Sequence, residues 1–367
     1  MNKNIINIIL VGCFVMLTSG FMLVNTIKPD GDFSYFERRK LLQPPGYSPE
    51  KLLNGQFFSD YEKYFLDQFV FRDTFRGLKA FTRLHLLNQK DNNGIYIIDG
   101  NINKIEYPLD EKAILNAAEK LNQVYERYLK ELNVSYAVIP DKNYFIADKY
   151  GYPSMDYDRL LEILQNNVLD MQYIDLFAHL SIDDYYRTDI HWSQEKIIDV
   201  ADIILAGMAN RYPASDFEYT EKELYPFYGA LYGQAALSIS PDTLFYLTNA
   251  MLEKATVYDY ETMTESKVYM TELFEGVDPY DIFLSGAKAL ITIENPEAAS
   301  DKELILFRDS FGSSIAPLLL GGYSKITMVD LRYISTDLLD NYIDFTKGQD
   351  VLFLYSTQIL NNSFMLR

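Results

Sequence analysis

The sequence contains a single cysteine, Cys13, among its 367 residues. One thiol cannot form a disulfide within the chain, and it cannot supply a zinc site built from several cysteines. A domain exported without disulfides depends for its stability on the size of its core, and a chain of this length can bury a substantial one. The cellular compartment therefore has to be inferred from features other than disulfides.

Histidines and basic residues are also few. The three histidines are His85, His179 and His191, and their spacing matches no zinc pattern, so we predict no metal and no other cofactor. Lysines and arginines number 33 against 52 aspartates and glutamates, which gives a formal net charge of -19, and no local basic stripe offsets it. A protein of this charge repels nucleic acid, so we expect no nucleic-acid partner.

Charged residues are missing altogether from the twenty positions between Ile5 and Val24. An apolar run of this length can cross the hydrocarbon core of a bilayer as a helix. We predict a single-pass anchor in the cell membrane, with the very short N-terminal segment in the cytosol and the rest of the chain on the extracytoplasmic side.

Two other interpretations of this run stay open. A cleaved signal peptide would use the small residues Thr18, Ser19 and Gly20, although the apolar run is longer than the usual core of such a peptide. A lipoprotein would be modified at Cys13 in "LVGC", although this cysteine lies in the middle of the run. The anchor is the interpretation that uses the whole run.

Residues 25–92 separate this run from the rest of the chain. Residues 25–50 are polar and contain four prolines, which is typical of an extended linker. Apolar side chains then recur three or four residues apart, which predicts one or two amphipathic helices. These side chains are Phe57, Tyr61, Tyr64, Phe65, Phe69 and Phe75. We interpret the aromatic stripe as a packing face.

Residues 93–367 alternate short apolar runs with helical patterns. The runs "VSYAVIP", "ALITIE", "ELILF", "KITMVDL" and "DVLFLY" predict buried strands, and residues 111–132, 156–168 and 194–210 predict helices. This alternation predicts an α/β domain with a mostly parallel sheet covered by helices on both faces. A stretch rich in tyrosine and glycine near residues 218–250 indicates a hairpin-like insertion.

A serine lies at a strand-to-helix corner in "ELILFRDSFGSSIAPLLLGGY". Ser310 follows the apolar strand and precedes a helix, and ligands bind parallel sheets beyond the carboxyl ends of their strands. The elbow of α/β hydrolases needs Gly-x-Ser-x-Gly, but Arg308 stands at the first glycine position, which argues against that fold. Taken alone, the corner favours a serine that caps its helix.

An aspartate and a histidine lie two residues apart in "YYRTDIHWSQEK", just before a predicted helix with Ser193 as its N-cap. In an extended loop Asp189 and His191 project to the same side, so the carboxylate can fix the tautomer of the imidazole and stabilise its charged form. A general base needs this arrangement. A surface histidine beside a capping aspartate is an equally good interpretation of the pair alone.

In combination, these elements resemble a known family. "TDIHW", "RDSFGSS" and "VDLRY", preceded by "FLDQFVFRD" and "VIPDKNYF", look like the bacterial DHHW proteins, which are related to the alginate O-acetylation proteins of the circularly permuted SGNH hydrolase superfamily. The similarity runs from about Phe33 to near the C-terminus, with Ile190 at the second residue of the family's namesake motif, where the family has a histidine. It implies a three-layer α/β/α, flavodoxin-like fold.

The resemblance also implies site residues. Asp189, His191 and Ser310 would form a catalytic triad, with the serine last in the chain. Ordinary SGNH enzymes take oxyanion donors from a glycine and an asparagine, for which Gly286 and Asn143 are the candidates here. For contacts with substrate we select four further residues, namely Trp192, Lys142, Arg332 and Tyr333. Trp192 either stacks on a sugar or anchors its helix to the core.

The implied function is an anchored extracytoplasmic O-acyltransferase or acetylesterase that acts on a cell-surface or secreted polysaccharide. Its implied partners are the glycan and a multipass membrane acyltransferase that supplies acyl groups. One alternative is a non-catalytic carbohydrate-binding or scaffold protein that keeps the fold. Another is a structural protein of the envelope, in which the three residues would be unrelated.

Overall fold

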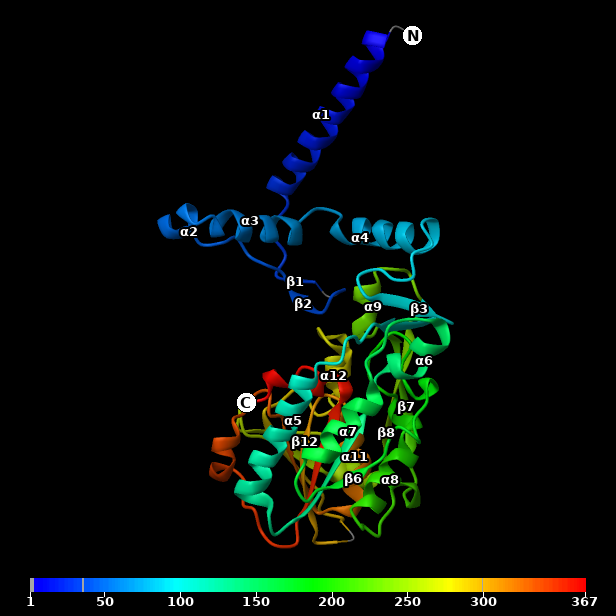
Figure 1. The fold of residues 1–367 in the computed structure, drawn as a ribbon, viewed down its shortest axis with the longest axis vertical. Coiled ribbons are helices and arrows are strands. Elements are labelled where there is room, and N and C mark those ends of the chain that lie inside the picture. Colours follow the sequence, from blue (N-terminus) through cyan, green and yellow to red (C-terminus); the bar gives the residue numbers. More distant parts are fainter. Residues whose placement is uncertain (1–2, 35, 299) are drawn as a thin grey trace. The chain divides into compact units, whose positions relative to one another are not determined.

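A computed structural model describes residues 3–34, 36–298 and 300–367, which divide into two compact units. The first unit comprises Met1–Asn92 together with Gly233–Ser238, and the second comprises Asn93–Tyr232 and Ile239–Arg367. Each unit has its own set of helices and strands (Figure 1).

The first unit begins with the long helix α1, Lys3–Ile27. It is apolar and long enough to cross a membrane, as the sequence predicts for a single-pass anchor or for a signal peptide. A two-stranded ribbon of β1 (Phe33–Ser34) and β2 (Arg39–Lys40) follows. Three helices complete the unit where we expected one or two, namely α2 (Pro49–Leu53), α3 (Gln56–Asp67) and α4 (Arg72–Phe81), and a short π-helix, Thr82–Leu86, extends α4.

An eight-stranded sheet forms the centre of the second unit, in the order β10-β9-β11-β13-β12-β14-β5-β6. The five strands from β13 to β6 are parallel, and β11, β9 and β10 are antiparallel, so the predicted mostly parallel sheet is confirmed. The parallel strands are β5 (Asn133–Ile139), β6 (Gln172–Ile174), β12 (Glu303–Arg308), β13 (Lys325–Val329) and β14 (Asp350–Ser356). The antiparallel strands are β9 (Thr256–Asp259), β10 (Thr264–Ser266) and β11 (Leu290–Glu294).

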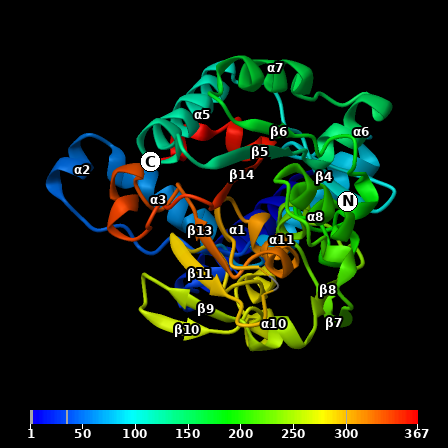
Figure 2. The same cartoon turned by 90° about the horizontal axis from the view of Figure 1, so that it is seen from below.

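Helices cover both faces of this sheet, which gives three layers (Figure 2). Helices α5 (Glu111–Val124) and α7 (Tyr157–Asn167) pack on one face, and α8 (Ile198–Gly207) and α11 (Gly312–Leu319) pack on the other. Alternate residues of β12 serve the two layers, since Leu304 and Leu306 face α8 and α11 while Ile305 and Phe307 face α5 and α7. Because both faces are buried there, the central strands β12, β13 and β14 are largely apolar, as the sequence indicates.

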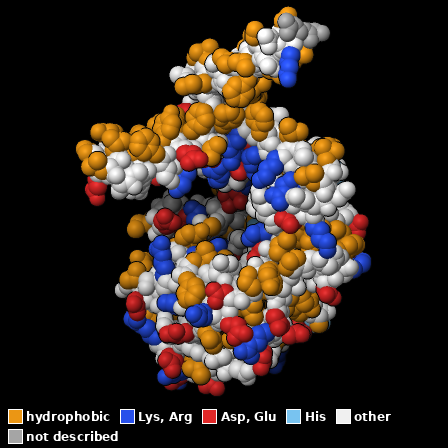
Figure 3. Space-filling view, turned by 45° about the horizontal axis from the view of Figure 1, so that its top comes forward, with side chains coloured by type: hydrophobic (Ala, Val, Ile, Leu, Met, Phe, Trp, Pro, Cys, Tyr) orange, Lys and Arg blue, Asp and Glu red, His pale blue; other side chains and the backbone are white. Residues whose placement is uncertain are grey.

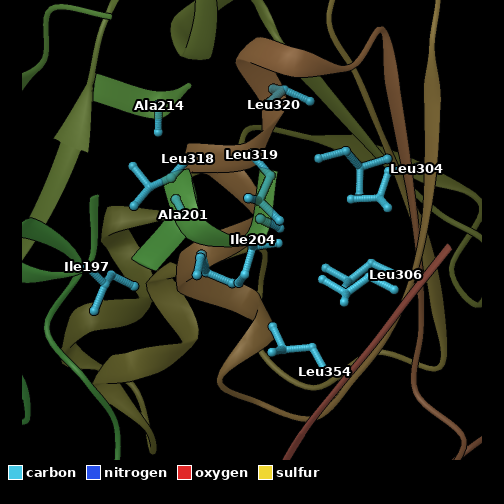
Figure 4. Packing of buried hydrophobic residues seen from close by; sticks show 14 of the residues in the cluster. Ile197, Ala201, Ile204, Ala214, Leu304, Leu306, Leu318, Leu319, Leu320 and Leu354 are labelled. Atoms are coloured by element: carbon cyan, nitrogen blue, oxygen red, sulfur yellow. The ribbon is translucent and has the colours of Figure 1, made fainter. Parts of the chain in front are cut away.

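The layer of α8 and α11 is packed with aliphatic side chains. Ile204 of α8, Leu319 of α11 and Leu306 of β12 are all fully buried, and Figure 4 shows them in one cluster. Completely buried aliphatic side chains contribute roughly 1.5–3 kcal/mol each relative to an exposed state. This packing fixes α11, and with it the corner that precedes it, against the sheet.

The remaining elements lie at the ends and edges of the sheet. They are the hairpin of β3 (Ile95–Ile98) and β4 (Asn101–Lys104), the hairpin of β7 (Thr220–Phe227) and β8 (Asp242–Thr248), and the short helices α6 (Lys142–Tyr150), α9 (Ala230–Ala235), α10 (Ala250–Lys254) and α12 (Thr357–Leu360). The helix expected over residues 111–132 is shorter than predicted, because α5 passes into a π-helix at Tyr125–Leu129. The helix expected over residues 194–210 starts as a separate 3-10 turn, Gln194–Lys196.

Candidate active site

The corner after β12 presents Ser310 beyond the carboxyl end of a central strand. Asp309 fixes this turn, because its carboxylate accepts hydrogen bonds from the backbone N–H of Phe311 at 3.0 Å and of Ser356 at 2.8 Å. Ser310 does not cap α11, since the N-cap position belongs to Phe311 and no side chain caps the helix there. The hydroxyl of Ser310 is therefore not used to cap the helix.

Glycine at position 312 is a requirement of this corner. A β-carbon at Gly312 would lie 2.6 Å from Cβ of Arg308, so any larger residue would push the helix away from the strand. This contact explains why a glycine follows two residues after the serine even though the first glycine of a hydrolase elbow is missing.

His191 joins Ser310 to Asp189. Its Nε2 lies 2.7 Å from Ser310 Oγ, and its Nδ1 lies 2.6 Å from Asp189 Oδ1. A proton on Nδ1 is donated to the carboxylate, which leaves Nε2 free to accept the hydrogen bond of the serine hydroxyl. The structure thus brings together the three residues that the sequence selected.

Asp189 is fully buried, and its orientation is set by backbone donors. Oδ1 accepts from the His191 N–H at 3.0 Å and Oδ2 accepts from the Ala230 N–H at 2.6 Å. Gly229 allows this approach, since a β-carbon there would lie 2.4 Å from Cβ of Asp189. The carboxylate is therefore held in place before any charge develops on the imidazole.

The imidazole is also held between aromatic rings. Tyr280 stacks on it with ring centroids 3.9 Å apart and an angle of 7°, and Phe311 contacts it at 4.8 Å. The Tyr280 hydroxyl donates to Ser314 Oγ at 2.7 Å, and burial raises its pKa well above the ordinary value, so it stays protonated. No sequence pattern points to Tyr280, because it lies in a short 3-10 turn, Pro279–Ile282, far along the chain from His191.

Trp192 was a candidate for contact with substrate, but it is not accessible to one. It is fully buried, packs edge-on against Phe311 and donates its Nε1–H to Ser314 Oγ at 2.8 Å. Gln194 makes a second bond to the same residue, from Nε2 to the carbonyl of Ser314 at 2.6 Å. Of the two roles considered for Trp192, anchoring to the core is therefore the one observed, and it fixes the segment after His191 to α11.

We predicted that Lys142 contacts substrate, but the structure places it in the interior. Its ammonium is buried and donates to four backbone carbonyls, those of Ile102 at 2.7 Å, Tyr186 at 2.8 Å, Arg187 at 3.0 Å and Asp189 at 3.2 Å. Burial lowers its pKa to about 7, against the opposing effect of the Asp189 and Asp242 charges. The side chain holds the backbone of the Asp189 loop and is not accessible to a polysaccharide.

Asn143 and Gly286 are not available as oxyanion donors, so these two candidates were wrong. Asn143 is buried, its Nδ2 donates to the carbonyl of Pro153 at 3.1 Å and its Oδ1 accepts from the Tyr96 hydroxyl at 2.8 Å. The N–H of Gly286 donates to the carbonyl of Phe283 at 3.1 Å. Both groups are thus used within the fold.

A backbone donor lies closer to the reacting position. Within the described part of the chain, the N–H of Ser310 has no hydrogen-bond acceptor. It belongs to the same residue as the hydroxyl and lies at the turn that precedes α11, where backbone N–H groups favour negative charge. Sequence reasoning missed this donor because a backbone group leaves no mark in a motif.

Arg332 and Tyr333 follow β13 at the same end of the sheet. Arg332 forms a two-point ion pair with Asp330, at 2.9 and 2.6 Å, and this partner raises the pKa of the guanidinium further above its usual value. Tyr333 is about half exposed, and the guanidinium of Arg332 lies 5.3 Å from its ring centroid. Contact of either residue with a substrate stays a prediction.

No group of three or more histidine, cysteine, aspartate or glutamate side chains that could hold a metal ion occurs in residues 3–34, 36–298 and 300–367.

Comparisons with known proteins agree with the resemblance seen in the sequence. Residues 162–329 match the model of the family described as DHHW protein, and this range contains all three residues of the hydrogen-bonded chain. No curated protein matches the sequence.

Solved structures show the same fold. A DHHW family protein from Eubacterium siraeum DSM 15702 is 23% identical over 74% of this chain and 93% of its own, with a TM-score of 0.60. Bacillus cereus PatB1 is 19% identical over 73% of this chain and 97% of its own, with a TM-score of 0.58, and its structure is also known with a sulfonyl adduct. The predicted three-layer α/β/α fold with a mostly parallel sheet is therefore confirmed.

Proposed function

We propose that this relative of the DHHW proteins is a serine-dependent O-acyltransferase or acetylesterase. Its substrate would be a cell-surface or secreted polysaccharide, and α1 would tether it to the outer side of the cell membrane. The observation that carries the proposal is the continuous hydrogen-bonded chain from Ser310 Oγ through His191 to Asp189. Nucleophile, base and orienting carboxylate are the three parts that acyl transfer through a covalent intermediate needs.

The first half of the reaction forms an acyl-enzyme. Ser310 Oγ attacks the ester carbonyl while His191 Nε2 takes its proton, and Asp189 stabilises the imidazolium that results. The N–H of Ser310 is the donor nearest to the developing oxyanion, and a donor in such a position contributes roughly 10²–10³ in rate. The imidazolium then returns its proton to the departing alcohol, and the acyl group remains on the serine.

The second half releases the acyl group. Water attack, with His191 again as base, gives an esterase, and attack by a sugar hydroxyl gives a transferase. Which of the two dominates depends on whether a bound glycan places its hydroxyl closer to the acyl carbonyl than water can come. Resemblance to alginate O-acetylation proteins supports the transferase and a multipass membrane acyltransferase as the source of the acyl group.

Ser310→Ala tests the proposal, and Ser313→Ala is its matched control. Ser313 is a buried serine three residues away whose Oγ has no hydrogen-bond partner in the described structure. With 4-nitrophenyl acetate and with an acetylated oligosaccharide, we expect Ser310→Ala to lower kcat by roughly 10³-fold or more. Ser313→Ala should stay near the wild-type value, and equal activity of all three proteins contradicts the proposal.

A sulfonyl fluoride gives an independent measurement. Because the hydrogen bond to His191 activates the hydroxyl of Ser310, we expect one sulfonyl adduct per wild-type chain and none on Ser310→Ala, by intact-protein mass spectrometry. An adduct on another residue would show that the reactive serine lies elsewhere.

A non-catalytic glycan-binding relative is the second candidate. The observation that favours it is that both predicted oxyanion donors, Asn143 and Gly286, are used within the fold. In this case wild-type protein and Ser310→Ala would bind the polysaccharide equally, and neither would cleave acetyl esters or take up a sulfonyl group.

A further inference from the structure

Helix α4 turns its two arginines toward the packed side and its large apolar residues toward the open side. Arg72 and Arg76 turn inward to Glu37, with nitrogen to oxygen distances of 2.5 and 3.1 Å. Phe71, just before the helix, and Leu78 on it are 64% and 59% exposed. A helix on the surface of a soluble domain has the opposite arrangement, with apolar residues toward the core.

The packed side of α4 is occupied by the same unit. Ala80 is fully buried, and the Arg76 guanidinium donates to the carbonyl of Gly233 at 2.9 Å. A β-carbon on Gly77 would lie 3.1 Å from the carbonyl oxygen of Ala236. The side of α4 that bears small residues and the two arginines thus already has its partner, whereas the large apolar side chains on the other side stay exposed among the described residues.

Helix α3 continues this apolar side. Phe58, Tyr61 and Leu66 are exposed, while Asp67 at its end is only 9% exposed and pairs with Arg39 at 2.5 Å. Figure 3 shows hydrophobic side chains gathered along these helices. Of the aromatic stripe that we interpreted as a packing face, Tyr61 and Phe75 are exposed and the other four members are partly buried. The exposed apolar side chains together form a surface that indicates an interaction site.

The open side joins the candidate membrane helix. Phe21 of α1 stacks on Phe69 with ring centroids 5.7 Å apart, and it also contacts Phe75 of α4 at 5.8 Å. Asn25 near the end of α1 accepts a hydrogen bond from the Val70 N–H at 2.8 Å. The apolar surface of α3 and α4 is thus continuous with α1, none of whose residues is buried within the protein.

We infer that α3 and α4 lie in the surface of the lipid bilayer that α1 crosses, with the side formed by Phe58, Tyr61, Phe71, Phe75 and Leu78 immersed. Amphipathic helices of this kind bury their apolar side about 5–10 Å into the boundary between head groups and acyl chains. A bilayer is favoured over a protein partner because the surface begins where the apolar helix ends and needs no additional chain. The inference depends on α1 crossing a membrane and not on catalysis.

Site-specific fluorescence tests the inference on the full chain. Cys13 is the only cysteine, so Cys13→Ser gives a background in which one new cysteine carries one label. Phe58→Cys and Leu78→Cys report the apolar side. Gln56→Cys and Lys63→Cys are the matched controls, because both positions are exposed and lie seven residues apart on the other side of α3.

Each protein is labelled with bimane and reconstituted at high lipid excess into vesicles of phosphatidylcholine and phosphatidylglycerol. We expect nitroxide-bearing lipids to quench the labels at 58 and 78 and aqueous iodide to quench those at 56 and 63, with little quenching in the reverse combinations. Iodide quenching at all four positions overturns the inference, since the helices would then lie in water. Protection of 58 and 78 from both quenchers also overturns it, because a second copy of the chain would then cover them.

Discussion

At the scale of single residues, the geometry of the site depends on a lysine that contacts no reacting atom. Lys142 Nζ donates to the carbonyls of Tyr186, Arg187 and Asp189, three points on the loop that carries the orienting carboxylate. We regard Lys142 as a positioning residue. Misplacing reacting groups by about 1 Å can lower a rate roughly 10²-fold.

Lys142→Met should therefore lower kcat by about 10-fold to 100-fold on 4-nitrophenyl acetate. The readout that separates positioning from mere stability is the pH profile. Because burial lowers the pKa of Lys142 to about 7, the wild-type ammonium loses its proton as pH rises through that value and offers one donor fewer to the loop. We expect wild-type activity to decline above about pH 7 for this reason.

The methionine variant lacks this group, so its profile should show no such decline. The charged groups that act on Lys142 are Asp189 and Asp242, and both are retained in the variant. An unchanged rate, or the same alkaline decline in both proteins, would show that the loop is held by other contacts.

Asp189→Asn tests the carboxylate itself. The amide keeps the shape of the side chain, but it favours the wrong tautomer of His191 and carries no charge to stabilise the imidazolium. We expect kcat to fall by roughly 10⁴-fold while the melting temperature changes little. A variant with nearly full activity would mean that His191 is not the general base.

The sequence predicted some of these residues and not others, for physical reasons. Asp189, His191 and Ser310 form recognisable short patterns, so their meeting could be anticipated. The burial of Lys142 and Trp192 depends on elements far apart in the chain, which no local pattern reveals. The Ser310 N–H is a backbone group, and every residue except proline has one.

At the scale of elements, the carboxyl end of β5 carries an unusual carboxylate. Asp141 caps α6 by accepting from the Asn143 N–H at 2.9 Å, and it also accepts from the hydroxyls of Tyr157 and Thr357. Burial raises its pKa to about 6, the ordinary value being 3.8. The group therefore links the starts of three helices, α6, α7 and α12, to the sheet, at the cost of burying a charge above that pH.

Asp141→Asn should make this cost measurable. The folded state binds the proton more tightly than the unfolded state, so the stability that Asp141 contributes falls as pH rises from about 4 to about 6. A shift of about two pKa units corresponds to about 3 kcal/mol. Wild type and Asp141→Asn can be unfolded with urea in detergent and followed by near-ultraviolet circular dichroism. The unfolding free energy of the wild type, relative to that of the variant, should fall by this amount as pH rises from about 4 to about 6. A difference that does not vary with pH contradicts the assigned shift.

The sequence predicted the type of most helices and strands better than it predicted where they begin and end. Strands buried on both faces are continuous apolar runs, so β5, β12, β13 and β14 could be located from sequence. The end of α5 could not, because Tyr125–Leu129 keeps the helical spacing of apolar residues while its hydrogen bonds change to the π pattern. The outward side of α4 could not either, since a periodic pattern shows that a helix has two sides and not which side meets water.

At the scale of the whole molecule, the fate of α1 decides where the protein acts. If α1 remains as an anchor, the chain should stay with the membrane pellet after extraction at alkaline pH, because a spanning helix is held by its apolar length. Mass spectrometry should then recover peptides from residues 3–27. Release into the supernatant, with a new N-terminus near Gly20, would instead show that the segment is a cleaved signal peptide.

The position of β14 in the sheet has a consequence for biogenesis. This strand is the last of the eight in chain order, yet it pairs with β12 on one side and β5 on the other. Before β14 has formed, β12, which leads to Ser310, has no hydrogen-bonded connection to β5 and β6. A chain that ends before Asp350 therefore lacks the strand that joins these two parts of the sheet, so the hydrogen-bonded chain of Ser310, His191 and Asp189 is expected to assemble only after residues 350–367 have been made.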